Sequence, residues 1–332
     1  MVAQFLRTSA LALAALALLA LAACDSSVEP TPGYCGELCK GEEFWFGDVS
    51  VEDVRAELER GVDANARDGS GYTPLLWAVL YGDSPEIIRL LLDRGADASA
   101  KDAGGTPILT YALVNGRSSE VIRWLLESGA DANAKNEHGK PVLHDAVRFA
   151  AYASHPETIK AASEFGRDLP AESIEIIQSL LEHGADASAR GGSEQPILFV
   201  YFAKIIEAGS EDNCRSVRSP CPDPRVVELL LERGAEVEVT EEDYTEQIMG
   251  YALWAGAGAE IIALLLEHGA DATARGDEGG TLLHTAALFT ADPQVFQMLL
   301  AHGADATAAD DRGYTACDLA RQDDEDVRAL LC

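Results

Sequence analysis

Leu90-Leu91-Leu92-Asp93-Arg94-Gly95-Ala96-Asp97-Ala98 is the clearest copy of a motif that returns along the whole chain. Each copy is a run of Leu or Val, then Gly, a small residue, an acid and another small residue. Seven copies contain Gly61, Gly95, Gly129, Gly184, Gly234, Gly269 and Gly303, and four of the six intervals are 34 or 35 residues. This period is typical of a solenoid of short helical units. Because such arrays grow by adding neighbours, the 332 residues predict one elongated domain.

Residues 68–101 show what one unit contains. Thr73-Pro74 predicts a turn followed by a helix, since Thr caps helix starts and Pro suits the first turn. Residues 86–92 are apolar at helical spacing and predict a second helix. Gly95 ends that helix, because glycine readily takes the left-handed conformation of a helix stop. The unit is therefore two helices and a turn, and the chain is predicted to be all-α.

Two stretches carry a resemblance to a known family. Gly279-Gly280-Thr281-Leu282-Leu283-His284-Thr285-Ala286-Ala287 resembles the opening of an ankyrin repeat, and Gly129-Ala130-Asp131-Ala132-Asn133-Ala134 resembles its close. The resemblance covers roughly Glu42 to Cys332 and implies an ankyrin-repeat solenoid of about seven to eight units, caps included. The expected units are a cap at 42–67, then 68–101, 102–135, 136–190, 191–240, 241–275, 276–309 and a cap at 310–332.

Two units are longer than the rest. The interval from Gly129 to Gly184 is 55 residues and that from Gly184 to Gly234 is 50. We expect insertions at 150–171 and 206–222, each between the two helices of its repeat, and a short helix within the first. Insertions in solenoids often lie on a face that binds, although loops also lengthen without gaining a function.

The resemblance further implies that a partner would lie in a concave groove, beside the end of each first helix. Aligned units place mostly bulky side chains there, and the candidate partner-binding residues are Tyr81, Asn115, Arg148, Phe149, Lys204, Trp254 and Phe289. Aromatic side chains concentrate binding energy at interfaces. The alternative is that these rings pack against neighbouring repeats.

The first 23 residues predict a signal peptide. Arg7 precedes a Leu/Ala run that ends at Leu21-Ala22-Ala23-Cys24, which resembles the lipobox of bacterial lipoproteins. The resemblance implies cleavage before Cys24, lipidation of its thiol, a tether at 24–41, and a location at the bacterial envelope, facing the periplasm or the exterior. A cleaved signal with a chance cysteine is the alternative.

The remaining cysteines form three local pairs. An export signal and an even number of cysteines favour disulfides over free thiols. The expected pairs are Cys35–Cys39, Cys214–Cys221 and Cys317–Cys332. Zinc is the alternative for the first pair, but no second ligand pair with finger spacing follows it.

The formal charge is −31, from 56 acidic and 25 basic residues. Such a field repels nucleic acid and attracts a cationic partner; solubility alone is the other explanation. His183, His268 and His302 each precede a motif glycine, where a histidine hydrogen-bonds the last carbonyls of a helix. No phosphate loop, nucleophile motif or metal-ligand grouping stands apart from the repeats, so we expect no metal, cofactor or enzymatic activity.

These observations predict a non-enzymatic, monomeric protein that binds a partner protein at the envelope. The partner is expected to be basic, and the membrane is contacted through the lipid anchor only. A second hypothesis is an immunity-type inhibitor of a basic toxin or enzyme. A catalytic role would require a titratable cluster off the repeat pattern, and the insertions show none.

Overall fold

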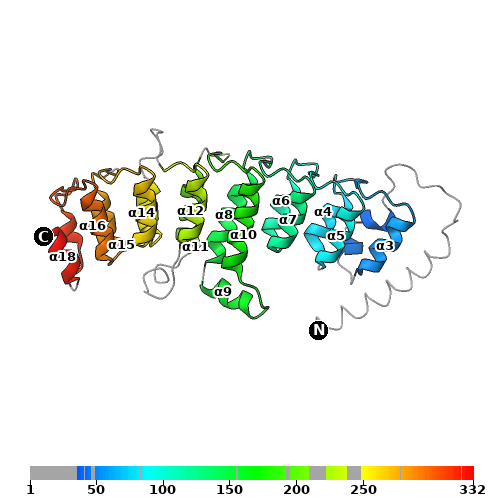
Figure 1. Cartoon of the computed structure of the whole chain (residues 1–332), viewed down its shortest axis with the longest axis horizontal. Helices are drawn as coiled ribbons and strands as arrows, with labels where there is room; N and C mark the ends of the chain where they lie inside the picture. The colour runs from blue at the N-terminus through cyan, green and yellow to red at the C-terminus, as the bar shows by residue number, and fades with distance from the viewer. Residues whose placement is uncertain are drawn as a thin grey trace.

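The protein is a row of stacked helix pairs (Figure 1). The computed structural model describes residues 36–40, 42–45, 49–82, 84–154, 156–191, 195–208, 222–237, 248–276, 278–322 and 324–332. Within these ranges the regular structure is helical, and strand pairing is confined to isolated bridges in the turns, such as Lys101 with Pro107. The predicted all-α solenoid is confirmed. The proposed signal peptide, Cys24, Cys35, Cys214 and Cys221 lie outside the described residues, as does most of 206–222.

The helices form two parallel rows, which we call inner and outer. The first helices of successive repeats contact one another and make the inner row. It contains α2 (Glu42–Trp45), α4 (Pro74–Tyr81), α6 (Ile108–Val114), α8 (Val142–Ala153), α11 (Ile197–Ala208), α13 (Ile248–Trp254), α15 (Leu282–Phe289) and α17 (Ala316–Leu319).

The second helices make the outer row in the same way. It contains α3 (Val51–Glu59), α5 (Pro85–Asp93), α7 (Ser119–Glu127), α10 (Leu169–Glu182), α12 (Pro224–Glu232), α14 (Ala259–Glu267), α16 (Pro293–Ala301) and α18 (Glu325–Leu331). A 3₁₀ helix, η1 (Gly36–Cys39), packs against α2, α3 and α4 at the N-terminal end of the stack.

In the repeat at 68–101, local chemistry sets the start of the first helix and the end of the second as the sequence predicts. The Thr73 side chain accepts a hydrogen bond from the Leu76 amide, and Pro74 occupies the first turn of α4. At the end of α5 the backbone turns at Gly95, whose φ of 82° is a left-handed value that favours glycine. The next amide, of Ala96, donates to the Leu91 carbonyl, so this carbonyl in the last turn of the helix has a hydrogen-bond partner.

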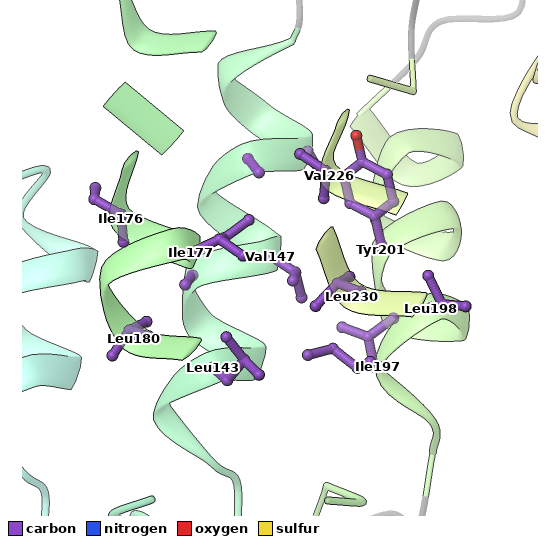
Figure 2. Packing of buried hydrophobic residues seen from close by; sticks show 14 of the residues in the cluster. Leu143, Val147, Ile176, Ile177, Leu180, Ile197, Leu198, Tyr201, Val226 and Leu230 are labelled. Carbon is purple, nitrogen blue, oxygen red and sulfur yellow. The ribbon is translucent and has the colours of Figure 1, made fainter. Parts of the chain in front are cut away.

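The core runs between the two rows without a break. Figure 2 shows α8, which carries Leu143 and Val147, between Ile177 of α10 on one side and Ile197 of α11 and Leu230 of α12 on the other. All are buried. Each repeat therefore hides its apolar face against the next one, which is why a solenoid needs neighbours and caps.

Hydrogen bonds between successive turns fix the register of the stack. The Asn65 side chain donates to the Gly95 carbonyl at 2.9 Å and accepts from the Asp97 amide at 2.6 Å. Asn133 makes the same two contacts, with the Gly184 carbonyl at 2.6 Å and the Asp186 amide at 2.8 Å. The pattern is therefore kept across the 55-residue interval between Gly129 and Gly184, so the extra residues do not disturb the stacking.

Those extra residues form a projection. The helix α9 (Pro156–Ser163) follows α8 and precedes α10 in sequence. It projects from the stack at the edge opposite the turns that link successive repeats (Figure 1). Both flanking helices are also longer than those of the repeat at 68–101: α8 has 12 residues where α4 has 8, and α10 has 14 where α5 has 9. The inner helix α11, in the other long repeat, also has 12. The insertion thus extends the helix pair before it turns.

Candidate functional site

The ends of the inner helices carry the side chains that the sequence singles out. We call this surface the inner face. It comprises the seven candidate partner-binding residues together with four residues adjacent to them in sequence, Leu80, Val114, Ala203 and Leu288. None of these side chains is buried. Three large apolar residues are open to solvent: Val114 is 71% exposed, Trp254 47% and Leu288 52%. Asn115 is also exposed, whereas Tyr81, Phe149 and Phe289 are half-buried.

An aromatic cluster spans α11, α13 and α15. The Trp254 ring centroid lies 6.0 Å from that of Phe289 and 6.0 Å from that of Tyr251. Tyr251 in turn packs edge-on against Phe199, with centroids 4.5 Å apart. Trp254 therefore both packs against the neighbouring repeat and remains exposed. Its neighbours hold its ring in place, so binding there would order few side chains.

A second aromatic cluster lies at α4 and α6. The Trp77 ring stacks on Tyr81 with centroids 5.4 Å apart, and Tyr72 lies 5.1 Å from Trp77 and 6.0 Å from Tyr111. The Tyr111 hydroxyl donates to Asp102. Burial raises the pKa of Tyr111, and the hydrogen bond to Asp102 adds to that shift, so this hydroxyl stays protonated.

Between the two clusters lies a cationic group on a buried carboxylate. Asp145 of α8 accepts hydrogen bonds from Thr110 Oγ1 at 3.2 Å, from Lys140 Nζ, and from Arg148 Nη1 at 3.4 Å. Lys204, on the adjacent α11, pairs with Glu207. We call Lys140, Arg148 and Lys204 the cationic centre. The pKa of Lys140 is lowered mainly by burial; Asp145 opposes this shift, while Arg148 and Lys204 add to it. The three cations therefore share one electrostatic environment.

The charge of the molecule is distributed unevenly between the two rows. From α4 to α15 the inner helices contain only four acidic or basic side chains: Asp145, Arg148, Lys204 and Glu207. The outer helices α5, α7, α10, α12 and α14 each carry at least two carboxylates and at most one arginine. Much of the helical acidity therefore lies on the side away from the inner face.

The projection carries a second set of exposed apolar side chains. Phe165, just after α9, is 84% exposed, and Tyr152 and Ile159 are also exposed. They belong to the segment 150–171, which the sequence identifies as an insertion. The projection is thus the rival to the inner face as a binding surface.

Three histidines have a structural role at the ends of outer helices. The Nδ1 atoms of His183, His268 and His302 each lie 2.8 Å from the carbonyl oxygen four residues earlier, as expected at a helix end. No group of three His, Cys, Asp or Glu side chains in the described ranges is arranged to hold a metal ion. Nor does any helix there have the length and apolarity needed to cross a membrane.

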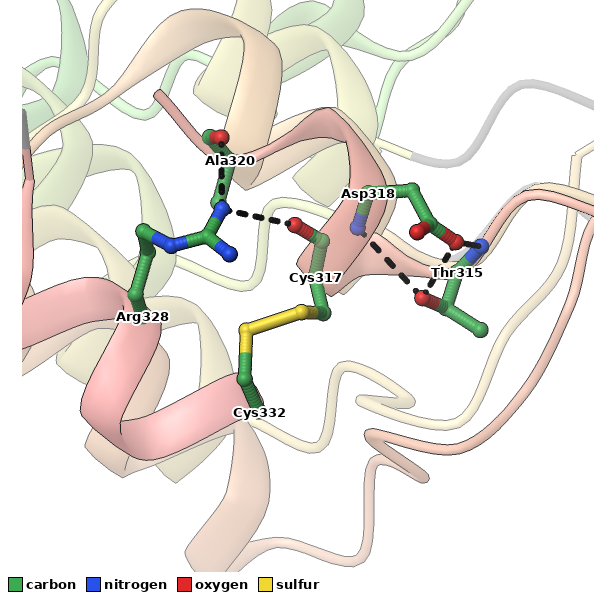
Figure 3. Close-up of a disulfide and its surroundings, with 6 residues drawn as sticks. All are labelled: Thr315, Cys317, Asp318, Ala320, Arg328 and Cys332. Carbon is green, nitrogen blue, oxygen red and sulfur yellow. Dashed lines mark hydrogen bonds between the residues drawn. A yellow bond between two sulfur atoms is a disulfide. The ribbon is translucent and has the colours of Figure 1, made fainter. Parts of the chain in front are cut away.

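One of the three expected disulfides lies within the described residues. Cys317 of α17 is bonded to Cys332 (Figure 3). The Arg328 guanidinium strengthens this end of the stack, since it donates to the carbonyls of Cys317 at 3.3 Å and Ala320 at 3.4 Å. For the other two expected pairs, the side chains lie outside what the structure describes.

Sequence reasoning named Arg148 and Lys204 of the cationic centre but missed Lys140 and the buried Asp145 that Lys140 and Arg148 contact. A signal for it existed, because Asp145 and Arg148 are three residues apart on one helix and so lie on the same face. Lys140 comes from the preceding turn, and its approach to Asp145 requires the folded geometry. The uneven distribution of acidic residues could also have been predicted from the sequence, by aligning the repeats and comparing the two helices of each unit.

Family models of ankyrin repeats match two parts of the chain. Residues 49–136 match a model described as ankyrin repeats (3 copies), and residues 265–320 match one described as ankyrin repeats (many copies). No curated protein matches the chain.

Solved ankyrin-repeat domains have a similar architecture. The ankyrin repeat domain of Bcl-3, described as a unique member of the IkappaB protein family, is 22% identical with a TM-score of 0.50; the match covers 79% of this chain and 99% of that one. The human ASB11 ankyrin repeat domain is 20% identical with a TM-score of 0.51, and the match covers 78% of this chain and 97% of that one. At these identities the likeness concerns the fold alone.

Proposed function

Since this chain has an ankyrin-repeat fold, and such domains are typically non-enzymatic protein–protein interaction modules, we propose that it binds a partner protein through its inner face. The observation that carries the proposal is the exposure of Val114, Trp254 and Leu288. Large apolar side chains that are exposed along one rigid surface favour a site that a partner covers. Trp254 is the central anchor, because a tryptophan held by neighbouring rings loses little entropy on binding and buries a large apolar area.

We also propose that the protein acts at the bacterial envelope, attached through a lipid on Cys24. The support is the sequence Leu21-Ala22-Ala23-Cys24 after an apolar run. Metabolic labelling with a radioactive fatty acid tests this directly. We expect label in the full-length protein and none in Cys24→Ala. Equal labelling of the two proteins would exclude lipidation at this cysteine.

Cross-linking in the native envelope, followed by affinity capture and mass spectrometry, tests the binding surface. The variant Trp254→Ala/Leu288→Ala removes two exposed inner-face side chains. The variant Trp254→Ala/Phe149→Ala extends the test to α8, on the far side of α11. We expect each to weaken capture of the partner by tenfold or more, as at interface hot spots. Circular dichroism checks that the helical signal is unchanged.

The matched control removes apolar surface from the projection instead. In Phe165→Ala/Ile159→Ala the stack is untouched, because both side chains are exposed beyond it. We expect partner capture to be unchanged. Loss of capture in this variant, with normal capture in the inner-face variants, would move the site to the projection.

The second candidate is an immunity-type inhibitor of a basic toxin or enzyme. It is favoured by the formal charge of −31 and by the acidic outer helices. An acidic surface accelerates association with a basic partner, and the acceleration falls steeply as salt rises. One stoichiometric basic partner in the cross-linking experiment, with an association rate that drops strongly with salt, would favour the inhibitor. Many weak partners would favour a general adaptor.

A further inference from the structure

We propose that the cationic centre binds a carboxylate side chain of the partner. The partner segment that lies on the inner face would then carry an Asp or Glu at this point, although this protein is itself strongly acidic. The inference rests on the proposed function, because it assigns the chemistry of the partner residue that would lie between the two aromatic clusters of the inner face. It concerns the partner's Asp or Glu rather than a polyanion, since a molecule of formal charge −31 repels polyanions.

Arg148 is the principal ligand. Its side chain is 38% exposed, so part of it is open to a partner, and its contact with Asp145 uses only Nη1. Its Nε is buried and has no hydrogen-bond partner. A guanidinium has five donors in a planar fork that matches a carboxylate. Because Asp145 occupies only Nη1 and part of the side chain is exposed, the outward N–H groups of the guanidinium are left for a second carboxylate, whereas the buried Nε is not.

The surroundings of Arg148 favour a carboxylate. Asp145 is almost fully buried and already receives Lys140, Thr110 and Arg148. Its charge is therefore offset by two cations, and Lys204 on α11 adds a third that is paired with Glu207. The helices on either side, α6 and α13, carry no charged residue. An incoming carboxylate would meet an excess of positive charge with apolar surface on both flanks.

The order of the inner helices also sets a spacing for the partner. Arg148 lies on α8 and Trp254 on α13, and α11 packs between them. With helices about 8–10 Å apart, the two side chains are separated by about 16–20 Å along the stack. An extended segment of about five or six residues covers this distance. We therefore expect the partner's acidic residue and its apolar anchor to be about that far apart in sequence.

Peptide display tests the inference without knowledge of the natural partner. The probe is a random 12-residue peptide library on phage, selected against the detergent-solubilised full-length protein. Long-range attraction by the acidic surface would enrich Lys and Arg. The inference predicts enrichment of Asp or Glu, together with an apolar residue at the stated spacing. Enrichment of basic residues alone would overturn it.

The selected peptides are then measured against matched variants. Arg148→Gln is expected to weaken their binding about tenfold, whereas Arg123→Gln, an exposed arginine on the outer helix α7, changes the protein charge equally and leaves binding unchanged. Lys204→Gln is a second test, because its partner Glu207 is on the surface and the fold does not depend on it. Equal affinities for wild type, Arg148→Gln and Lys204→Gln would overturn the inference.

The two proposals fail in different ways. If Trp254→Ala/Leu288→Ala leaves peptide binding unchanged, the inner face is not the binding surface and the proposed function fails. If that variant loses binding while Arg148→Gln and Lys204→Gln do not, the inner face binds but the carboxylate site is wrong. A library that yields no binder to the wild-type protein counts against both.

Discussion

At the scale of single residues, Asp145 shows how one carboxylate links stability to the binding surface. It is buried on an inner helix, and its partners come from three elements: Thr110 on α6, Lys140 in a turn and Arg148 on α8. Removing a buried charge leaves its partners uncompensated, which costs more than the intact pair contributes.

We expect Asp145→Asn to lower the free energy of unfolding by about 1–3 kcal/mol, less than for a fully buried pair because both cations are partly exposed. Urea denaturation measures the loss. The control is Asp93→Asn, since Asp93 pairs with Arg89 at 3.3 Å on the exposed side of α5. Asp93→Asn should change the free energy of unfolding by less than about 1 kcal/mol, because loss of this exposed pair is partly offset by removing an acid from a helix C-terminus. Equal losses in the two variants would show that burial of Asp145 contributes nothing.

His144, next to Asp145, predicts a pH dependence. Burial lowers its pKa from 6.5; the Ala189 carbonyl, 3.0 Å from Nε2, opposes the shift. Below pH 6.5 the unfolded chain therefore binds a proton that the folded chain does not, and stability falls as pH falls. The carboxyl groups of Asp53 and Asp318 have lowered pKa values in the folded protein and a pKa near 3.8 in the unfolded chain. They therefore stay ionised between about pH 7.5 and about pH 5.5, and histidine is the side chain that titrates in this range.

The measurement is the urea midpoint at the two ends of that range. We expect the wild-type midpoint to fall on acidification, and His144→Gln to fall less. The matched variant is His183→Gln, which changes an exposed histidine at a helix end and leaves His144 in place. A wild-type slope in His144→Gln would show that this residue does not carry the effect.

The candidate site was predictable only in part at this scale. Alignment of the repeats finds Trp254 and Phe289, because equivalent positions on successive first helices share a face. It does not tell that Phe149 is half-buried while Val114 is exposed. Exposure depends on how each side chain packs on its neighbours, and that is a property of the folded array.

At the scale of elements, the insertion at 150–171 illustrates what periodicity leaves open. The interval between Gly129 and Gly184 locates the extra residues, and a helix start near Pro156 is readable from the sequence. The greater length of α8 and α10 is a feature of the fold that these sequence signals do not indicate. It follows from apolar contacts that continue beyond the usual end of the pair: Ala150, Ala153 and Leu169 are buried there. Those contacts make longer helices favourable.

The C-terminal cap is the element that the disulfide stabilises. Cys317 and Cys332 are 15 positions apart in sequence, and the bond between them ties α17 to the end of α18. We expect Cys317→Ala/Cys332→Ala to lower the free energy of unfolding of this cap by about 3 kcal/mol, through the larger entropy of the open chain. Hydrogen exchange should quicken in α17 and α18 and remain unchanged in α4 to α8, because a solenoid loses stability locally. Unchanged exchange in the cap would show that Arg328 and the core hold it without the disulfide.

At the scale of the whole molecule, the acids follow the repeat as closely as the glycines do. An acid stands two residues before six of the seven motif glycines: Glu59, Asp93, Glu127, Glu182, Glu232 and Glu267. Each ends an outer helix and is exposed. Carboxylates at a C-terminus are repelled by the helix dipole as well as by one another. The row therefore costs stability, and its periodic placement could have been predicted from the sequence alone, since it needs only the alignment of the motifs.

Neutralising part of this row should stabilise the protein. In Glu182→Gln/Glu232→Gln/Glu267→Gln, three helix C-termini lose an unfavourable charge, and we expect a gain of about 1–2 kcal/mol at low salt. The matched variant is Glu86→Gln/Glu120→Gln/Glu260→Gln, which changes the net charge equally but at the first turns of α5, α7 and α14, where the dipole favours an acid. Both triples relieve the same overall repulsion, so their difference in urea denaturation isolates the dipole term. It should shrink in high salt, because these side chains are at the surface. Equal stabilisation by the two triples would mean that net charge alone, rather than the position of each acid on its helix, governs the effect.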